Sequence, residues 1–160
     1  MQSLHRIEDK IIQTKNLKHW VKTQGNAIDR LVFTNGCFDV IHRGHITYLA
    51  QAADLGTHFI VALNTDASVA RLKGANRPVQ DEYTRALVMA AFEFVDFVCF
   101  FDEDTPLNII KLLKPKVLVK GGDYIVKDIV GYNDVVQAGG EVVTIDFVKG
   151  FSSSSIINSI

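Results

Sequence analysis

Two histidines three positions apart, His42 and His45, are the residues of this sequence best placed to do chemistry. At that spacing they lie on one face of a helix, and both imidazoles can donate hydrogen bonds to phosphate oxygens. They follow an apolar run ending at Phe33 and a turn containing Gly36, which lets a ligand approach the backbone closely. A helix that begins at the histidines would add free N–H groups and the positive end of its dipole. The pattern therefore predicts a phosphate site.

Other interpretations of the histidine segment must be weighed against this one. The sequence contains neither GxxxxGK[ST] nor GxGxxG, so an ordinary P-loop and a dinucleotide fingerprint are both excluded. Two histidines could bind a metal, but structural zinc needs further Cys or His ligands, and no such cluster occurs. A strand, turn and helix with surface histidines is the remaining alternative. We expect no metal site, and we expect Gly44, between the histidines, to leave space for the ligand.

Short apolar runs alternate with amphipathic stretches along the chain. The runs predict strands at residues 31–33, 59–63, 97–101, 117–119 and 142–145. They are continuous, as in parallel strands covered on both faces. Helices are expected over 46–53, over 83–94, and from Thr105 as N-cap with Pro106 at the first helical position through Leu113. The acidic residues 102–104 are assigned to that helix start and not to a metal.

This order of elements predicts an α/β fold, a doubly wound, Rossmann-like parallel sheet of five strands. Ligands of such sheets bind outside the carboxyl ends of the strands, here the loops after residues 33, 63 and 119. At 160 residues the chain is expected to form one domain, 1–160, with a helical extension over 1–28. Leu17, Trp20 and Val21 give that extension an apolar face. It covers the sheet, the alternative we prefer, or contributes to the interface of a homo-oligomer.

Composition sets limits on location and partners. A net charge of −1 predicts neither nucleic-acid binding nor attraction to an anionic membrane. The two cysteines, Cys37 and Cys99, form no CxxC pair, which suits a reducing compartment, and Cys99 is expected to be a buried, inert thiol. The sequence shows no signal peptide and no apolar stretch long enough for a membrane span. We therefore expect a cytoplasmic protein.

The HxGH element in this setting resembles the cytidylyltransferase-like nucleotidyltransferase superfamily. Over approximately residues 30–157 the sequence is similar to one of its families, the D-glycero-D-manno-heptose 1-phosphate adenylyltransferases. The landmarks, in order, are NTDASV at 64–69, RLKG at 71–74, RPV at 77–79, FDEDTP at 101–106, LVKGGDY at 118–124 and GGEV at 139–142. The resemblance implies direct in-line transfer of AMP from Mg²⁺-bound ATP to a heptose 1-phosphate, giving ADP-heptose and pyrophosphate for lipopolysaccharide synthesis. It also implies a separate heptose kinase.

The resemblance assigns roles to individual positions. His42, His45 and Lys73 would be catalytic, with Lys73 holding phosphates of both substrates. The remaining residues implied to bind the nucleotide are Gly36, Cys37, Phe38, Arg85, Gly121, Asp123, Ser152, Ser153, Ser154 and Ser155. The serines would open the last helix under the β- and γ-phosphates. In many relatives this motif continues with threonine and ends with a basic residue, where this chain has Ser154 and Ile157, so a phosphate contact is missing or comes from elsewhere.

Several of these positions have a structural alternative. Lys73 and Arg77 could be solvated loop charges, and Asp123, after two glycines, could belong to a turn. Arg85 could pair with Asp81 or Glu82, its neighbours on the predicted helix. Asp39 could bind a ligand or cap the turn before the histidines.

Two other functions share the central motif. A cytidylyltransferase for glycerol 3-phosphate or a similar small phosphate would use the same chemistry. A nucleotide-binding regulatory module would bind without turnover. The presence of both histidines and Lys73 favours an enzyme over the module.

Overall fold

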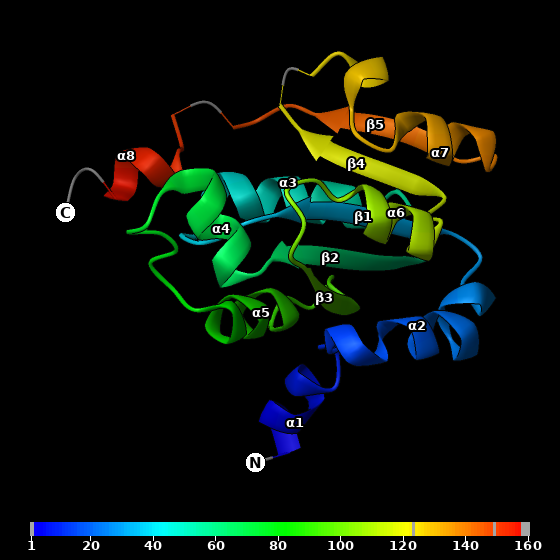
Figure 1. Cartoon of the computed structure of the whole chain (residues 1–160), viewed down its shortest axis with the longest axis horizontal. Coiled ribbons are helices and arrows are strands. Elements are labelled where there is room, and N and C mark those ends of the chain that lie inside the picture. Colours follow the sequence, from blue (N-terminus) through cyan, green and yellow to red (C-terminus); the bar gives the residue numbers. More distant parts are fainter. Residues whose placement is uncertain (1, 123, 149, 158–160) are drawn as a thin grey trace.

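The computed structural model describes residues 2–122, 124–148 and 150–157, except for the side chain of Ser154. Its centre is a sheet of five parallel strands in the order β3-β2-β1-β4-β5. The strands are β1 (Leu31–Gly36), β2 (His58–Asn64), β3 (Phe97–Phe101), β4 (Val117–Gly121) and β5 (Glu141–Ile145). After β1 the chain builds first one side of the sheet and then the other, so β1 and β4 lie at the switch point (Figure 1). The predicted doubly wound α/β fold is confirmed.

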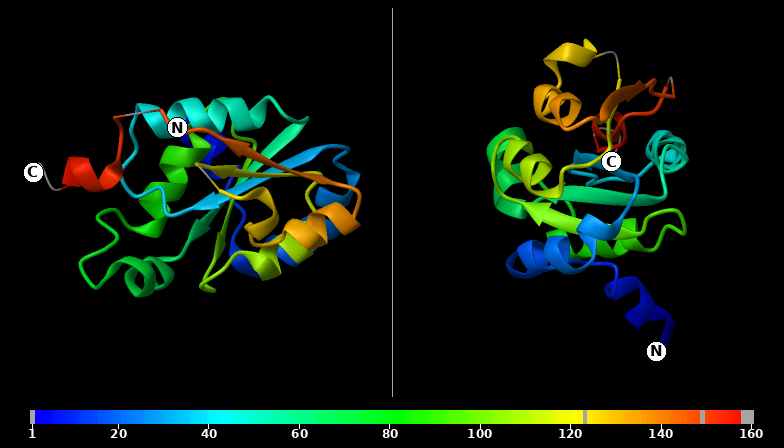
Figure 2. Two further views of the ribbon diagram at one scale, coloured as in Figure 1. Left: turned by 90° about the horizontal axis from the view of Figure 1, so that it is seen from above. Right: turned by 90° about the vertical axis from the view of Figure 1, so that its right-hand side faces the viewer.

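Helices cover both faces of this sheet (Figure 2). Among the described residues the helices are α1 (Gln2–Glu8), α2 (Thr14–Thr23), α3 (Arg43–Ala53), α4 (Asp66–Lys73), α5 (Glu82–Ala90), α6 (Leu107–Leu113), α7 (Tyr132–Gln137) and α8 (Ser153–Ile157). Two short 3₁₀ turns, η1 (Gly25–Ala27) and η2 (Val126–Asp128), accompany them. The core on one face joins α2, α6 and α7 to the sheet, and the core on the other joins α3 and α5. Within the described residues, none of these helices has the length and apolar character needed to span a bilayer.

The predicted strands match the observed ones in number and place, and Cys99 is fully buried as expected. The first strand runs three residues further than predicted, because Thr34, Asn35 and Gly36 continue the pairing with β2. Polar side chains had suggested that these residues form a loop. The extension brings Asn35 and Gly36 to the carboxyl edge of the sheet as part of a strand.

Two helix boundaries were predicted wrongly. Pro106 is the N-cap of α6 and not its first helical residue, because its ψ of 12° is not helical while its carbonyl already accepts the first bond, from Ile110 N–H. The second helix of the prediction ends at Ala90 and not at Phe94, and Phe94 instead stacks on Phe92 in the turn that follows. The helices α4 and α7 were not predicted.

The N-terminal segment covers the sheet, which was the preferred of its two predicted roles. Helix α2 buries Leu17, Trp20 and Val21, and the Trp20 ring meets the edge of Phe97 with centroids 4.8 Å apart. Between α1 and α2 the chain pairs in parallel with strand β3. Here the Ile12 N–H donates to the Val98 carbonyl, and the Val98 N–H donates to the Lys10 carbonyl.

Because Trp20 is 6% exposed and packs on β3, its replacement should leave a cavity under the sheet. We expect Trp20→Ala to lower the free energy of unfolding by about 3–5 kcal/mol. Lys18→Ala, on the exposed side of the same helix, is the matched control and should stay within about 0.5 kcal/mol of wild type. Urea titrations followed by circular dichroism measure both. Similar small losses in the two variants would show that α2 is only loosely attached.

Candidate active site

A pocket of about 530 Å³ opens at the carboxyl ends of the strands, where the switch point lies. Its size suits a small-molecule ligand. Its wall includes seven of the residues assigned from the sequence: Gly36, Cys37, Phe38, His45, Lys73, Gly121 and Ser153. Residues from β1, α3, β2, α4, β3, β4 and the C-terminal segment all contribute to it. The fold thus gathers positions that are more than a hundred residues apart in sequence.

The two histidines stand at the start of helix α3. His42 is the N-cap residue, and its side chain makes no capping hydrogen bond. The two imidazoles stack with centroids 3.9 Å apart and an interplanar angle of 25°. Their Nδ1 atoms are buried, and neither has a hydrogen-bond partner within the described part of the chain. Buried polar atoms normally find partners, so two orphaned ones at a helix N-terminus indicate a place for an anion.

The charge state of the histidines follows from their surroundings. Burial, together with the smaller effects of the nearby charges of His42 and Lys73, lowers the pKa of His45 to about 4. Burial also lowers the pKa of His42. In the free protein at neutral pH, His45 is therefore an uncharged imidazole. A bound polyanion would favour protonation and raise both pKa values.

A tight turn connects β1 to the histidines. Phe38 has a φ of 45°, in the left-handed region that non-glycine residues rarely adopt, and its ring packs edge-on against His45. That ring also occupies the space beside Gly36, where a Cβ would come within 2.9 Å of it. Gly44 has a different role from the one predicted. The His42 ring and Phe151 fill the space beside Gly44, so this glycine accommodates a protein side chain instead of a ligand.

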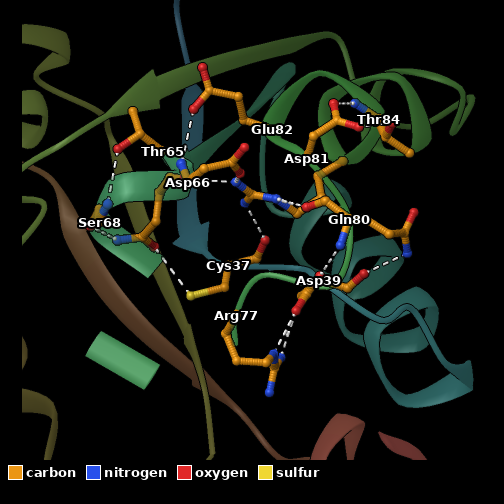
Figure 3. A network of polar contacts seen from close by, with 12 residues as sticks. Cys37, Asp39, Thr65, Asp66, Ser68, Arg77, Gln80, Asp81, Glu82 and Thr84 are labelled. Carbon is orange, nitrogen blue, oxygen red and sulfur yellow. Dashed lines mark hydrogen bonds and ion pairs between the residues drawn. The ribbon is translucent and has the colours of Figure 1, made fainter. Parts of the chain in front are cut away.

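Arg85 lies behind the pocket and not in its wall, contrary to our assignment to the nucleotide. The side chain is fully buried and four of its five N–H donors are hydrogen-bonded. They reach the carbonyls of Cys37 at 2.7 Å, Asn64 at 2.8 Å and Gln80 at 3.1 Å, and the Asp66 carboxylate at 2.7 Å. The alternative partners Asp81 and Glu82 are engaged elsewhere, with Thr84 and the Asp66 N–H respectively (Figure 3). Arg85 is a positioning residue for the turn at Cys37.

Asp39 makes a second internal connection, which neither of its predicted roles described. Its buried carboxylate accepts bonds from Arg77 Nε at 2.8 Å and from the Val79 and Gln80 N–H groups at 2.9 Å (Figure 3). Burial raises the pKa of Asp39, but these bonds and the Arg77 charge together hold it below its usual value. Arg77 Nη2 also lies 2.7 Å from the carboxylate, but without hydrogen-bond alignment, so the Nε bond defines the pair. The loop before α5 is thereby fastened to the histidine turn.

The remaining predicted residues are distributed as follows. Lys73, the last residue of α4, is exposed at the pocket. Ser153 lines the pocket and donates to the Val40 carbonyl at 2.8 Å, whereas the Ser152 hydroxyl accepts the Ser155 N–H at 3.4 Å as a cap of α8. Ser152 and Ser155 are exposed outside the pocket wall. Asp123 and the Ser154 side chain lie outside the described residues.

Sequence reasoning missed several pocket residues, above all Lys120. It follows Val119 near the end of β4, and its Nζ donates to Asn35 Oδ1 at 3.3 Å. Tyr124 and Phe147 also line the pocket, and the Phe147 ring lies so close to Gly121 that a Cβ there would be 2.6 Å away. Ligands of doubly wound sheets bind at the carboxyl ends of the strands, and Lys120 is the first residue after the predicted strand end at 119, so it could have been proposed from the sequence. Within LVKGGDY, only Gly121 and Asp123 were assigned a role from the sequence.

The pocket offers Mg²⁺ little from the protein itself. Asp39 is fully engaged by Arg77 and two amides, and Asp104, at the pocket, is paired with Arg71. Mg²⁺ is commonly held by substrate phosphates with few protein ligands. The donor set therefore fits an ion that enters with a triphosphate as part of the substrate.

A family model described as cytidylyltransferase-like matches residues 33–159. Among curated proteins, the bifunctional protein HldE of Marinomonas sp. (strain MWYL1) is 47% identical over 98% of this chain and 33% of the relative. The bifunctional protein HldE of Campylobacter jejuni subsp. jejuni serotype O:2 is 52% identical over the whole chain and 34% of the relative. The chain thus spans about one third of the length of these relatives.

Solved structures share the fold. A lipopolysaccharide core biosynthesis protein from Thermoplasma volcanium superposes with a TM-score of 0.61 at 26% identity, covering 76% of this chain and 98% of that protein. Pantothenate synthetase from Thermus thermophilus gives a TM-score of 0.58 at 18% identity, covering 91% of this chain and 66% of that protein. The second likeness concerns the fold alone.

The contacts of Arg85 predict a large effect of its removal. Arg85→Met should lower the free energy of unfolding by about 3–5 kcal/mol, because buried carbonyls lose a charged donor and Asp66 loses its partner. Arg71→Met is the matched control: its ion pairs with Asp102 and Asp104 are exposed, so a change within about 1 kcal/mol is expected. Urea denaturation measures both losses. Equal effects would contradict the special position of Arg85.

The low pKa of His45 predicts proton uptake on anion binding. A bound polyanion raises that pKa from its free value of about 4, so tripolyphosphate binding at pH about 6 should take up protons. Calorimetry in buffers of different ionisation enthalpy measures the uptake. His45→Asn should reduce it, whereas His19→Asn, on the exposed surface of α2, should not. Uptake that is undiminished in His45→Asn would place the anion elsewhere.

Proposed function

Because this chain belongs to the cytidylyltransferase-like family, we propose that it transfers AMP from ATP to D-glycero-D-manno-heptose 1-phosphate. An oxygen of the sugar phosphate attacks the α-phosphorus, the bond from that phosphorus to the β-phosphate breaks, and pyrophosphate leaves. The products are ADP-heptose and pyrophosphate. No covalent intermediate with the protein is needed.

The observation that carries this proposal is the stacked histidine pair at the start of α3. Both Nδ1 atoms are buried and lack a partner among the described residues; His45 lines the pocket together with Lys73 and Lys120, and His42 stacks on His45 from outside the pocket wall. In-line phosphoryl transfer depends on positioning and on charge stabilisation more than on a protein nucleophile. Protonated imidazoles would stabilise the charge that develops on the α-phosphoryl oxygens. Lys73 would neutralise the phosphates on the side of the pocket formed by α4.

Mg²⁺ would arrive with the nucleotide and neutralise charge on its phosphates. The protein's own contribution is then geometric. Arg85 fixes the Cys37 carbonyl and Asp39 fixes the loop at 77–80, so the turn and the histidines keep one arrangement before the substrates bind. Such preorganisation avoids the cost of reordering the site during the reaction.

The choice of heptose 1-phosphate rests on two supports. One is the ordered set of sequence landmarks, of which 118–124 supplies Lys120 and Gly121 to the pocket. The other is identity of about half over nearly the whole chain to proteins named HldE, together with the likeness to a protein of lipopolysaccharide core biosynthesis. The heptose 1-phosphate itself would have to come from a reaction that phosphorylates the sugar at its anomeric oxygen.

A matrix of nucleoside triphosphates against sugar and alcohol phosphates tests the proposal, with pyrophosphate release as the measurement. We expect ATP with heptose 1-phosphate to be the best pair. His45→Ala should remain folded and lower kcat by roughly 10²–10³, the effect of losing one transition-state donor. Faster turnover of CTP with glycerol 3-phosphate would overturn the substrate assignment. ATP binding without pyrophosphate release in any pair would indicate a regulatory module instead.

A further inference from the structure

The basic side chains at and beside the pocket fall into two sets. His42, His45 and Lys73 form one group, because the charges of His42 and Lys73 both act on the pKa of His45. Lys120, near the end of β4, is not among the charges that shift the pKa of His45. Its ammonium is beside Asn35 and Cys37, and burial lowers its pKa.

Among the described residues, no acidic side chain forms an ion pair with Lys120. Its hydrogen bond to Asn35 Oδ1, at 3.3 Å, is to a neutral amide. An ammonium has three donors, so two are without a partner in the part of the chain that the structure describes and are open to a ligand. A half-buried charge of this kind is costly unless an opposite charge joins it. Since Lys120 lines the pocket, that opposite charge can come from a substrate.

We propose that Lys120 binds the phosphate group of the acceptor substrate. This inference rests on the proposed function, in which two anions must meet in one pocket. The histidine group, at the N-terminus of α3, suits the longer triphosphate. Lys120 lies at the switch point between β1 and β4, with Gly121 after it and the Gly36–Cys37 turn also in the pocket wall. A second cation there would hold the attacking phosphate and reduce its repulsion from the first.

The test compares Lys120→Gln with Lys116→Gln, each of which removes one positive charge in or next to strand β4. Lys120→Gln should raise the KM for heptose 1-phosphate roughly 10- to 100-fold, the scale for losing a charged hydrogen bond. The KM for ATP and the thermal protection by ATP should stay close to wild type. Lys116→Gln, an exposed lysine just before β4, is the control and should change neither. A KM that rises only for ATP in Lys120→Gln would overturn the inference.

A second variant keeps Lys120 but neutralises its charge with a neighbouring carboxylate. Asn35→Asp places a carboxylate where the amide oxygen now lies 3.3 Å from Nζ, so it should raise the KM for heptose 1-phosphate in the same way. An unchanged KM for heptose 1-phosphate in both Lys120→Gln and Asn35→Asp, each confirmed as folded by its melting temperature, would overturn the inference.

A binding measurement separates this inference from the proposed function. With a non-hydrolysable ATP analogue present, inorganic phosphate should protect wild type and Lys116→Gln against thermal unfolding, and protect Lys120→Gln much less. Equal protection of all three proteins, or protection of none, would overturn the role of Lys120. If phosphate protects as expected but wild type does not adenylylate heptose 1-phosphate, the proposed function fails while the anion site stands.

Discussion

The carbonyl oxygens of Cys37, Asn64 and Gln80 converge on one buried guanidinium, that of Arg85. These carbonyls belong to three separate connections: the turn after β1, the end of β2, and the loop before α5. A planar group with five N–H donors can satisfy all three and still bind the Asp66 carboxylate at the start of α4. Arg85 thereby holds the turn beside the histidines and the start of α4, the helix that carries Lys73, from outside the pocket wall.

The polar groups of this region fall into two sets with opposite consequences. Arg85 and Asp39 have their hydrogen bonds satisfied within the chain, which makes them part of the folded frame. The Nδ1 atoms of His42 and His45 have no such partner among the residues described, and desolvation keeps His45 neutral. Arg85 and Asp39 thus need no ligand to complete their hydrogen bonds. Under the proposed function, an anion bound at the histidines would supply the partners that the two Nδ1 atoms lack.

The sequence was sufficient for the strands, the parallel sheet and the placement of the two histidines at a helix start, because each depends on local pattern: apolar runs, a glycine turn and residues three apart on a helix. The role of Arg85 could not be predicted from local pattern. Its partners are backbone carbonyls up to 48 positions away, and a carbonyl leaves no mark in a sequence. Pro106 failed for another reason, since proline is compatible with both the N-cap and the first helical position, and only the backbone torsions decide. The sequence shows a lysine at position 120, but it does not show that this lysine is half-buried in the pocket wall.

The pairing of the N-terminal segment with β3 has a consequence outside the reaction. Strand β3 reads Phe-Val-Cys-Phe-Phe and lies at an edge of the sheet, where unpaired N–H and carbonyl groups can recruit a strand from another molecule. Short, apolar, uncharged segments of this kind are prone to intermolecular β-association. The Lys10 carbonyl and the Ile12 N–H occupy both hydrogen-bonding groups of Val98, the second residue of β3, on the side of the strand away from β2. The residues between α1 and α2 thus leave less of this strand edge free to pair with another molecule, although none of them lines the pocket.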